Sequence, residues 1–88
     1  MSDTKVLSES QMQAMGITRR NVRRTGFRLL RQGKLRGLNR QEISAEILDE
    51  IASENQDQFK DVVGIDWDSV LEFIERMLPL ILQLIALF

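Results

Sequence analysis

The chain contains no cysteine and no histidine, and these two absences exclude most enzyme chemistry. Disulfide frameworks, zinc and haem ligation, and the Ser-His or Cys-His pairs of nucleophilic enzymes all need one of these residue types. The sequence also has no Gly-rich phosphate loop and no convergent pair of acid and base groups. We therefore expect a protein that is not an enzyme and that has no catalytic, cofactor-binding or metal-binding residues.

The chain is short, with 88 residues, one proline and one tryptophan. A chain of this size buries only about 60–65% of the surface that it exposes when unfolded, so contacts with a partner or with further copies are expected to stabilise it. We expect one domain over residues 1–88 and no small-molecule substrate. The first seven residues include Asp3 and no apolar run. This predicts that there is no signal peptide, and that the protein is cytoplasmic or part of a particle assembled there.

Charge divides the chain into two halves. Residues 1–40 hold ten Lys and Arg against two acidic residues, a net of +8, whereas residues 41–88 hold two against eleven, a net of −9. Two interpretations are open: the halves pack together within or between chains, or the basic half binds nucleic acid. In the acidic helix and loop of residues 41–66, the carboxylates face outward, and we expect no metal site there.

Residue types that favour helix N-termini recur along the chain in one pattern, with an apolar residue just before them and another four positions after. These positions are Ser8, Thr18, Asn39 and Asp66. Gln11 and Glu42 follow Ser8 and Asn39 at the spacing of a capping box. No run alternates in the period of two that strands need. The sequence predicts an all-α, four-helix domain with helices over residues 8–15, 18–33, 40–57 and 67–88.

The helix expected over residues 18–33 is amphipathic, with basic residues over most of one side. Phe27 projects from the middle of that side, where its ring could stack on a base, contact a neighbouring subunit or pack within its own chain. Gly26 and Gly33 lie on the apolar side, and we expect another backbone to approach closely at both. The residues expected to contact nucleic acid or an acidic partner are Arg19, Arg20, Arg23, Arg24, Phe27, Arg28, Arg31, Lys34 and Arg36.

The segment 67–88 is expected to be a long apolar helix, uncharged from Met77 onward. Pro79 falls on its polar stripe, where the missing N–H should kink the helix or start a new turn. The large apolar side chains occupy most of the circumference of this helix, which is more than one neighbouring element can cover. We therefore expect these residues to mediate assembly. The expected interface consists of Phe73, Leu78, Leu80, Ile81, Leu82, Leu84, Ile85, Leu87 and Phe88.

A membrane role for this segment is the weaker alternative. Twelve uncharged residues span only about 18 Å as a helix, against about 30 Å for the hydrocarbon core of a bilayer. The helix could instead lie on a membrane surface, but its polar stripe is acidic, and anionic lipids would repel it.

One function explains three features together: the apolar segment 67–88, the opposite charges of the two halves, and the lack of catalytic residue types. We expect a non-enzymatic structural protein that self-associates, or docks on a larger complex, through its C-terminal helix. In general type it is similar to virion accessory components and scaffold-like adaptors. Nucleic-acid binding by residues 18–40 and association with a membrane surface are the two alternatives.

Overall fold

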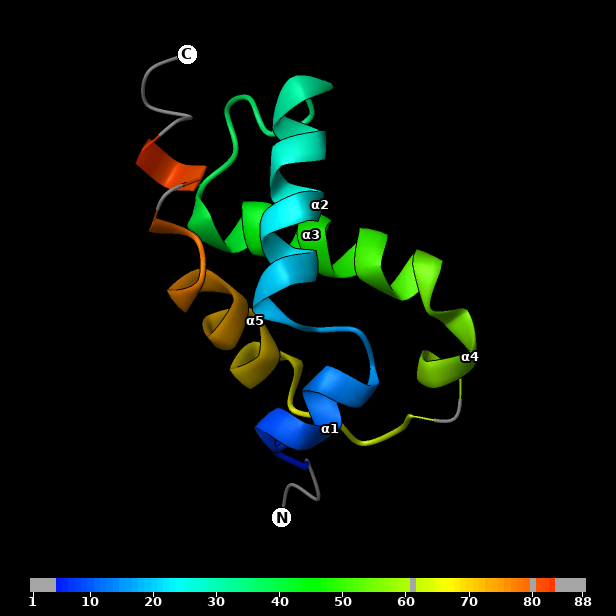
Figure 1. Cartoon of the computed structure of the whole chain (residues 1–88). Coiled ribbons are helices and arrows are strands. Elements are labelled where there is room, and N and C mark those ends of the chain that lie inside the picture. The colour runs from blue at the N-terminus through cyan, green and yellow to red at the C-terminus, as the bar shows by residue number, and fades with distance from the viewer. Residues whose placement is uncertain (1–4, 61, 80, 84–88) are drawn as a thin grey trace.

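The computed structural model describes residues 5–60, 62–79 and 81–83. Its helices are, in chain order, α1 (Glu9–Ala14), α2 (Arg19–Arg31), α3 (Arg40–Glu54), α4 (Gln56–Phe59) and α5 (Trp67–Arg76) (Figure 1). Residues 81–83 are also helical. The described residues form no strand, and one parallel bridge joins Lys5 to Ile65. The predicted all-α fold class is confirmed.

Helix α3 is the centre of the packing, because it contacts both α2 and α5. Helix α1 lies with the segment 62–66 at the end of the molecule marked N in Figure 1. Backbone hydrogen bonds hold this end together: the Lys5 N–H donates to the Gly64 carbonyl at 2.6 Å, and the Asp66 N–H donates to the Lys5 carbonyl at 2.8 Å. The start of the described chain is thereby fastened to the residues that precede α5.

Local capping explains where three of the helices begin. The side chains that accept a hydrogen bond from the backbone N–H three positions later are Ser8, Thr18 and Asn39. Gln11 and Glu42 accept a bond in return from the N–H of the cap residue, so both predicted capping boxes are confirmed. Asp66 stands at the start of α5 but makes no such bond. Its carboxylate accepts a hydrogen bond from the Ser69 hydroxyl at 2.8 Å instead.

The core joins the inner sides of α2, α3 and α5 with residues from the turns and from the C-terminal stretch. Two of its buried side chains are polar, Thr25 and Ser44. The Ser44 hydroxyl donates to the Arg40 carbonyl at 3.0 Å. The side chains that are less than 2% exposed are Ile17, Val22, Thr25, Leu29, Leu35, Ile43, Ile47, Ile51, Val70, Ile74, Leu78 and Ile81.

The helix predicted over residues 40–57 is shorter than expected, because α3 ends at Glu54 and α4 is a separate turn. Asn55 lies between them with φ −127° and ψ 43°, outside the helical region. Its side-chain amide donates to the Ile51 carbonyl at 2.8 Å. Asparagine side chains compete in this way with the backbone bonds of a helix. The same side chain lies against Gly16, where a Cβ would collide with it.

The single helix predicted over residues 67–88 is also wrong over the part that is described. Helix α5 ends at Arg76, and helical structure resumes at residue 79. Pro79 has no N–H to donate to the Glu75 carbonyl, which accepts from the Leu78 N–H at 3.1 Å instead. Proline is tolerated in the first turn of the stretch that follows. The new turn expected at Pro79 is thus observed, and residues 84–88 of the predicted helix lie outside the described residues.

Leu78 and Ile81 belong to the chain's own core, where their side chains are 0% and 1% exposed. Ile81 fills the space left by the missing side chain of Gly26, and a Cβ at Gly26 would collide with the end of the Ile81 side chain. The close approach predicted at Gly26 is therefore observed, although a side chain makes it. At Gly33 the prediction is wrong over the described part of the chain, none of whose atoms lies within 4 Å of the Cβ position. That glycine serves the turn after α2 with φ +73°.

Candidate functional site

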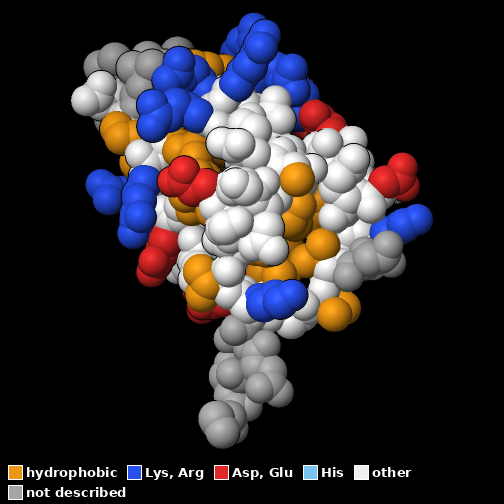
Figure 2. Space-filling view, turned by 60° about the horizontal axis from the view of Figure 1, so that its bottom comes forward, with side chains coloured by type: hydrophobic (Ala, Val, Ile, Leu, Met, Phe, Trp, Pro, Cys, Tyr) orange, Lys and Arg blue, Asp and Glu red, His pale blue; other side chains and the backbone are white. Residues whose placement is uncertain are grey.

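The strongest concentration of charge lies on the outer side of α2 and on the turn that follows it. Val22, Gly26 and Leu29 face the core, so the helical period turns the residues between them outward. Lys and Arg side chains gather at the top and the upper left of the face shown in Figure 2. We define the basic surface as the exposed residues Arg19, Arg20, Arg23, Arg24, Arg31, Lys34 and Arg36.

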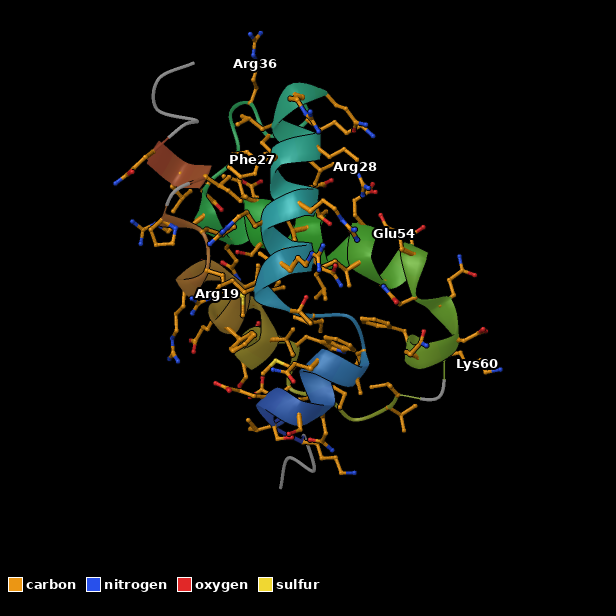
Figure 3. The ribbon with its side chains drawn as sticks, viewed as in Figure 1. Arg19, Phe27, Arg28, Arg36, Glu54 and Lys60 are labelled. Atoms are coloured by element: carbon orange, nitrogen blue, oxygen red, sulfur yellow. The ribbon has the colours of Figure 1, made fainter. Side chains whose placement is uncertain are left out.

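Neutralisation of this region by the acidic half is confined to one arginine. Arg28 donates to Glu50 at 3.2 Å and to Glu54 at 2.6 Å, and these are the ion pairs formed among the described residues. Figure 3 shows Arg28 and Glu54 directed toward one another, whereas Arg36 points away from the molecule. The hydrogen bond to Glu54 is the main cause that raises the pKa of Arg28 above its ordinary value. Among the described residues, the carboxylates of the acidic half therefore form ion pairs only at one edge of the basic surface, and the other cations of this surface stay exposed.

Phe27 is half-buried and packs against the core cluster, so packing within its own chain is observed for this ring. Figure 3 shows its side chain projecting from α2. Stacking on a base and contact with another subunit stay predictions for Phe27.

A hollow with an arginine-rich wall lies where α2 begins and α5 ends. It has a volume of about 290 Å³ and is lined by Arg19, Arg23, Arg76, Met77, Pro79 and Ile81. Arg19 and Arg23 are one helical turn apart, which places them on the same side of α2, and Arg76 comes from the last turn of α5. Among the described residues, no acidic side chain belongs to this lining. We name it the arginine hollow.

A second hollow, of about 310 Å³, adjoins the arginine hollow and shares Arg19, Arg76 and Met77 with it. It extends toward α1, and we name it the Phe73 hollow because that ring is its one aromatic wall. The remaining lining residues are Glu9, Gln13, Ile17 and Thr18. Cationic and aromatic side chains thus line two hollows that have three residues in common.

Arg76 and the role of Phe73 were missed by the sequence analysis. Arg76 belongs to the acidic half, and its visible signal is that of a cation in the last turn of a helix, where the helix dipole favours it. Nothing in the sequence places α5 beside the start of α2. Phe73 was assigned to an assembly interface, and the structure gives it a half-buried position lining the Phe73 hollow.

The predicted assembly interface is not brought together as one exposed surface within the described residues. Leu78 and Ile81 belong to the core, and Phe73 and Leu82 are half-buried against it. The other members, Leu80, Leu84, Ile85, Leu87 and Phe88, lie outside the described residues.

Exposed apolar side chains occur instead near α1 and the segment before α5. Val6 is 69% exposed and Val63 is 82% exposed. Val63 borders a hollow of about 350 Å³ whose other walls include Leu7, Met15 and Ile65. Hydrophobic side chains are visible across the lower half of the view in Figure 2. A second, apolar feature is therefore present beside the charged one.

The described part of the chain contains no group of three or more acidic residues arranged to hold a metal ion. None of its helices combines the length and the apolar character needed to cross a membrane. No protein-family model matches the sequence, and comparisons with curated proteins and with solved structures found no match.

Proposed function

We propose that this protein is a non-enzymatic nucleic-acid-binding protein that contacts the phosphate backbone with the basic surface of α2. The observation that carries the proposal is the exposure of these Lys and Arg side chains beside an acidic half that pairs with Arg28 alone among the described residues. Arginine forks bind phosphate oxygens with two parallel hydrogen bonds, which suits a polyanion better than a small ligand.

The surface fits a backbone more than a base sequence. Thirteen residues of α2 extend about 20 Å, and Lys34 and Arg36 continue the row beyond its end, so several phosphates can be met at once. Contacts of this kind hold a protein in register without reading bases. We therefore expect affinity that depends strongly on salt and weakly on sequence.

The test is a titration of a fluorescent duplex oligonucleotide, followed by anisotropy over a range of salt concentrations. If five or six cations meet phosphates, log K should fall with log[salt] at a slope of about −5. Arg24→Gln should make that slope shallower by about 0.9. Lys60→Gln is the matched control, because Lys60 is an exposed cation beyond α4, away from α2 (Figure 3). A slope near zero for the unmodified protein would remove the proposal.

Self-assembly is the second candidate, and the exposure of Val6 and Val63 favours it independently. Light scattering behind size exclusion gives the mass directly. We expect a defined oligomer that Val63→Glu reduces to a smaller species with its helices intact, whereas Lys60→Glu, on a nearby turn, should leave the mass unchanged. For the C-terminal interface expected from the sequence, Leu82→Asp together with Ile85→Asp is the corresponding variant. A monomer at every concentration would end this candidate.

A further inference from the structure

The arginine hollow has an unusual composition for a surface depression. Arg19, Arg23 and Arg76 approach it from two helices, and its other walls are the apolar residues Met77, Pro79 and Ile81. Guanidinium groups near apolar walls find few protein acceptors there, and no carboxylate within the described residues pairs with any of the three. Like charges held close together are stabilised by an anion that they share. Phosphate is the anion whose oxygens match the guanidinium fork.

The start of α2 adds to this preference. Arg19 is the first residue of a helix of 13 residues, and Thr18 caps it. The N-terminal end of a helix carries a partial positive charge, which favours an anion near its first turn. Thr18 lines the Phe73 hollow and Arg19 lines both hollows, so the charge of the helix end favours an anion where the two hollows adjoin.

The Phe73 hollow has a different character. Phe73 supplies an aromatic wall, while Glu9 and Gln13 supply polar groups from α1. Arg19 and Arg76 line both hollows, but Glu9 lines only the Phe73 hollow and repels phosphate. The phosphate of a ligand is therefore favoured in the arginine hollow, and the uncharged part of the ligand in the Phe73 hollow. A nucleobase is such a part, because it can stack on the ring and donate its amino hydrogens to Glu9 or Gln13.

We infer that these adjoining hollows hold one nucleotide of a single strand, with its phosphate among Arg19, Arg23 and Arg76 and its base against Phe73. The inference rests on the proposed nucleic-acid binding and adds a preference to it. Bases inside a duplex are stacked and paired and cannot enter a hollow, whereas an unpaired base can turn outward onto an aromatic side chain. The two hollows, of about 290 and 310 Å³, are at the lower limit of the volumes of ligand pockets. The protein should therefore prefer single strands to duplexes.

The first comparison uses two variants that each remove one positive charge. Arg76→Gln removes a wall of the arginine hollow, while Arg36→Gln removes an exposed cation that points away from the molecule. Binding of a fluorescent single-stranded oligonucleotide is measured at one salt concentration. We expect Arg76→Gln to weaken it about tenfold and Arg36→Gln about threefold or less. Equal losses in the two variants would overturn the phosphate assignment.

The second comparison tests the base. Phe73→Leu keeps an apolar side chain but removes the ring, so binding to the single strand should weaken about tenfold while binding to the duplex changes less than about twofold. Phe73→Tyr should retain the preference, which separates stacking from any damage to the fold. Phe59 stacks on Trp67 and lines neither hollow, so Phe59→Leu serves as the aromatic control and should affect both ligands alike. A Phe73→Leu variant that loses both ligands equally, with Phe73→Tyr failing to restore the preference, would overturn the base assignment.

Failure of this inference differs from failure of the proposed function. If the salt slope is near zero for single strands and duplexes, the protein does not bind nucleic acid and both proposals fall. If Arg24→Gln changes the slope while Arg76→Gln and Phe73→Leu match their controls, the basic surface binds the backbone and the nucleotide site alone is rejected.

Discussion

At the scale of single residues, Thr25 is a core position with a polar side chain that lacks a hydrogen bond in the described part of the chain. Its side chain is 0% exposed, and its hydroxyl finds no partner among the described residues. Burying a hydroxyl without a hydrogen bond costs free energy, and valine has the same branched shape without the polar atom. We expect Thr25→Val to raise the free energy of unfolding by about 1 kcal/mol. Urea denaturation followed by circular dichroism measures the change.

The reverse substitution one turn earlier is the control for Thr25→Val. Val22 is also 0% exposed, so Val22→Thr buries a hydroxyl at a matched place in α2 and should lower the free energy of unfolding by about 1–3 kcal/mol. A loss of stability in Thr25→Val would mean that its hydroxyl donates a hydrogen bond after all, and the unsatisfied group would be rejected.

At the scale of elements, the contact between Gly26 and Ile81 fixes the C-terminal stretch onto α2. Gly26→Ala adds a methyl group where the end of the Ile81 side chain lies. Overpacking of this kind costs about 1–3 kcal/mol, which exceeds the gain of up to about 1 kcal/mol from the better helix propensity of alanine. We expect Gly26→Ala to lower the free energy of unfolding by about 1 kcal/mol.

A double-mutant cycle tests this contact directly. Ile81→Val removes the atom that the new methyl group meets, so Gly26→Ala should cost little or become stabilising in that background, with a coupling of about 1 kcal/mol or more. Gly33→Ala, where nothing lies within 4 Å of the Cβ position, should show no coupling to Ile81→Val. Additive effects at Gly26 would mean that the C-terminal stretch does not pack on α2.

Helix starts were predictable from the sequence, and helix ends were less so. The caps at Ser8, Thr18 and Asn39 depend on side chains three positions from the N–H groups that they bind, so their signal is local. The break at Asn55 coincides with a contact to Gly16, far away in the sequence. At Pro79 a new turn was expected from the sequence. The burial of Ile81 was not, because it depends on the space beside Gly26 of α2, which exists only in the folded chain.

At the scale of the whole molecule, the sequence predicted one side of the candidate site and missed the other. The basic surface follows from periodicity within α2 alone. Arg76 and Phe73 join it because α5 is packed on α3, which brings the end of α5 to the start of α2. The opposite charges of the two halves indicated attraction between them, and the ion pairs observed in the described part of the chain are those of Arg28 with Glu50 and Glu54.

The bridge between Lys5 and Ile65 has a consequence for the speed of folding. It joins residues 60 positions apart in the sequence, and the contact of Gly26 with Ile81 joins residues 55 positions apart. Local helices form in about a microsecond, but contacts between distant parts of a chain require a long loop to close first, at a cost in entropy. Proteins with many such contacts fold more slowly than simple helical bundles. We therefore expect the helices of this protein to form early in folding, and their assembly around α3 to be the rate-limiting step.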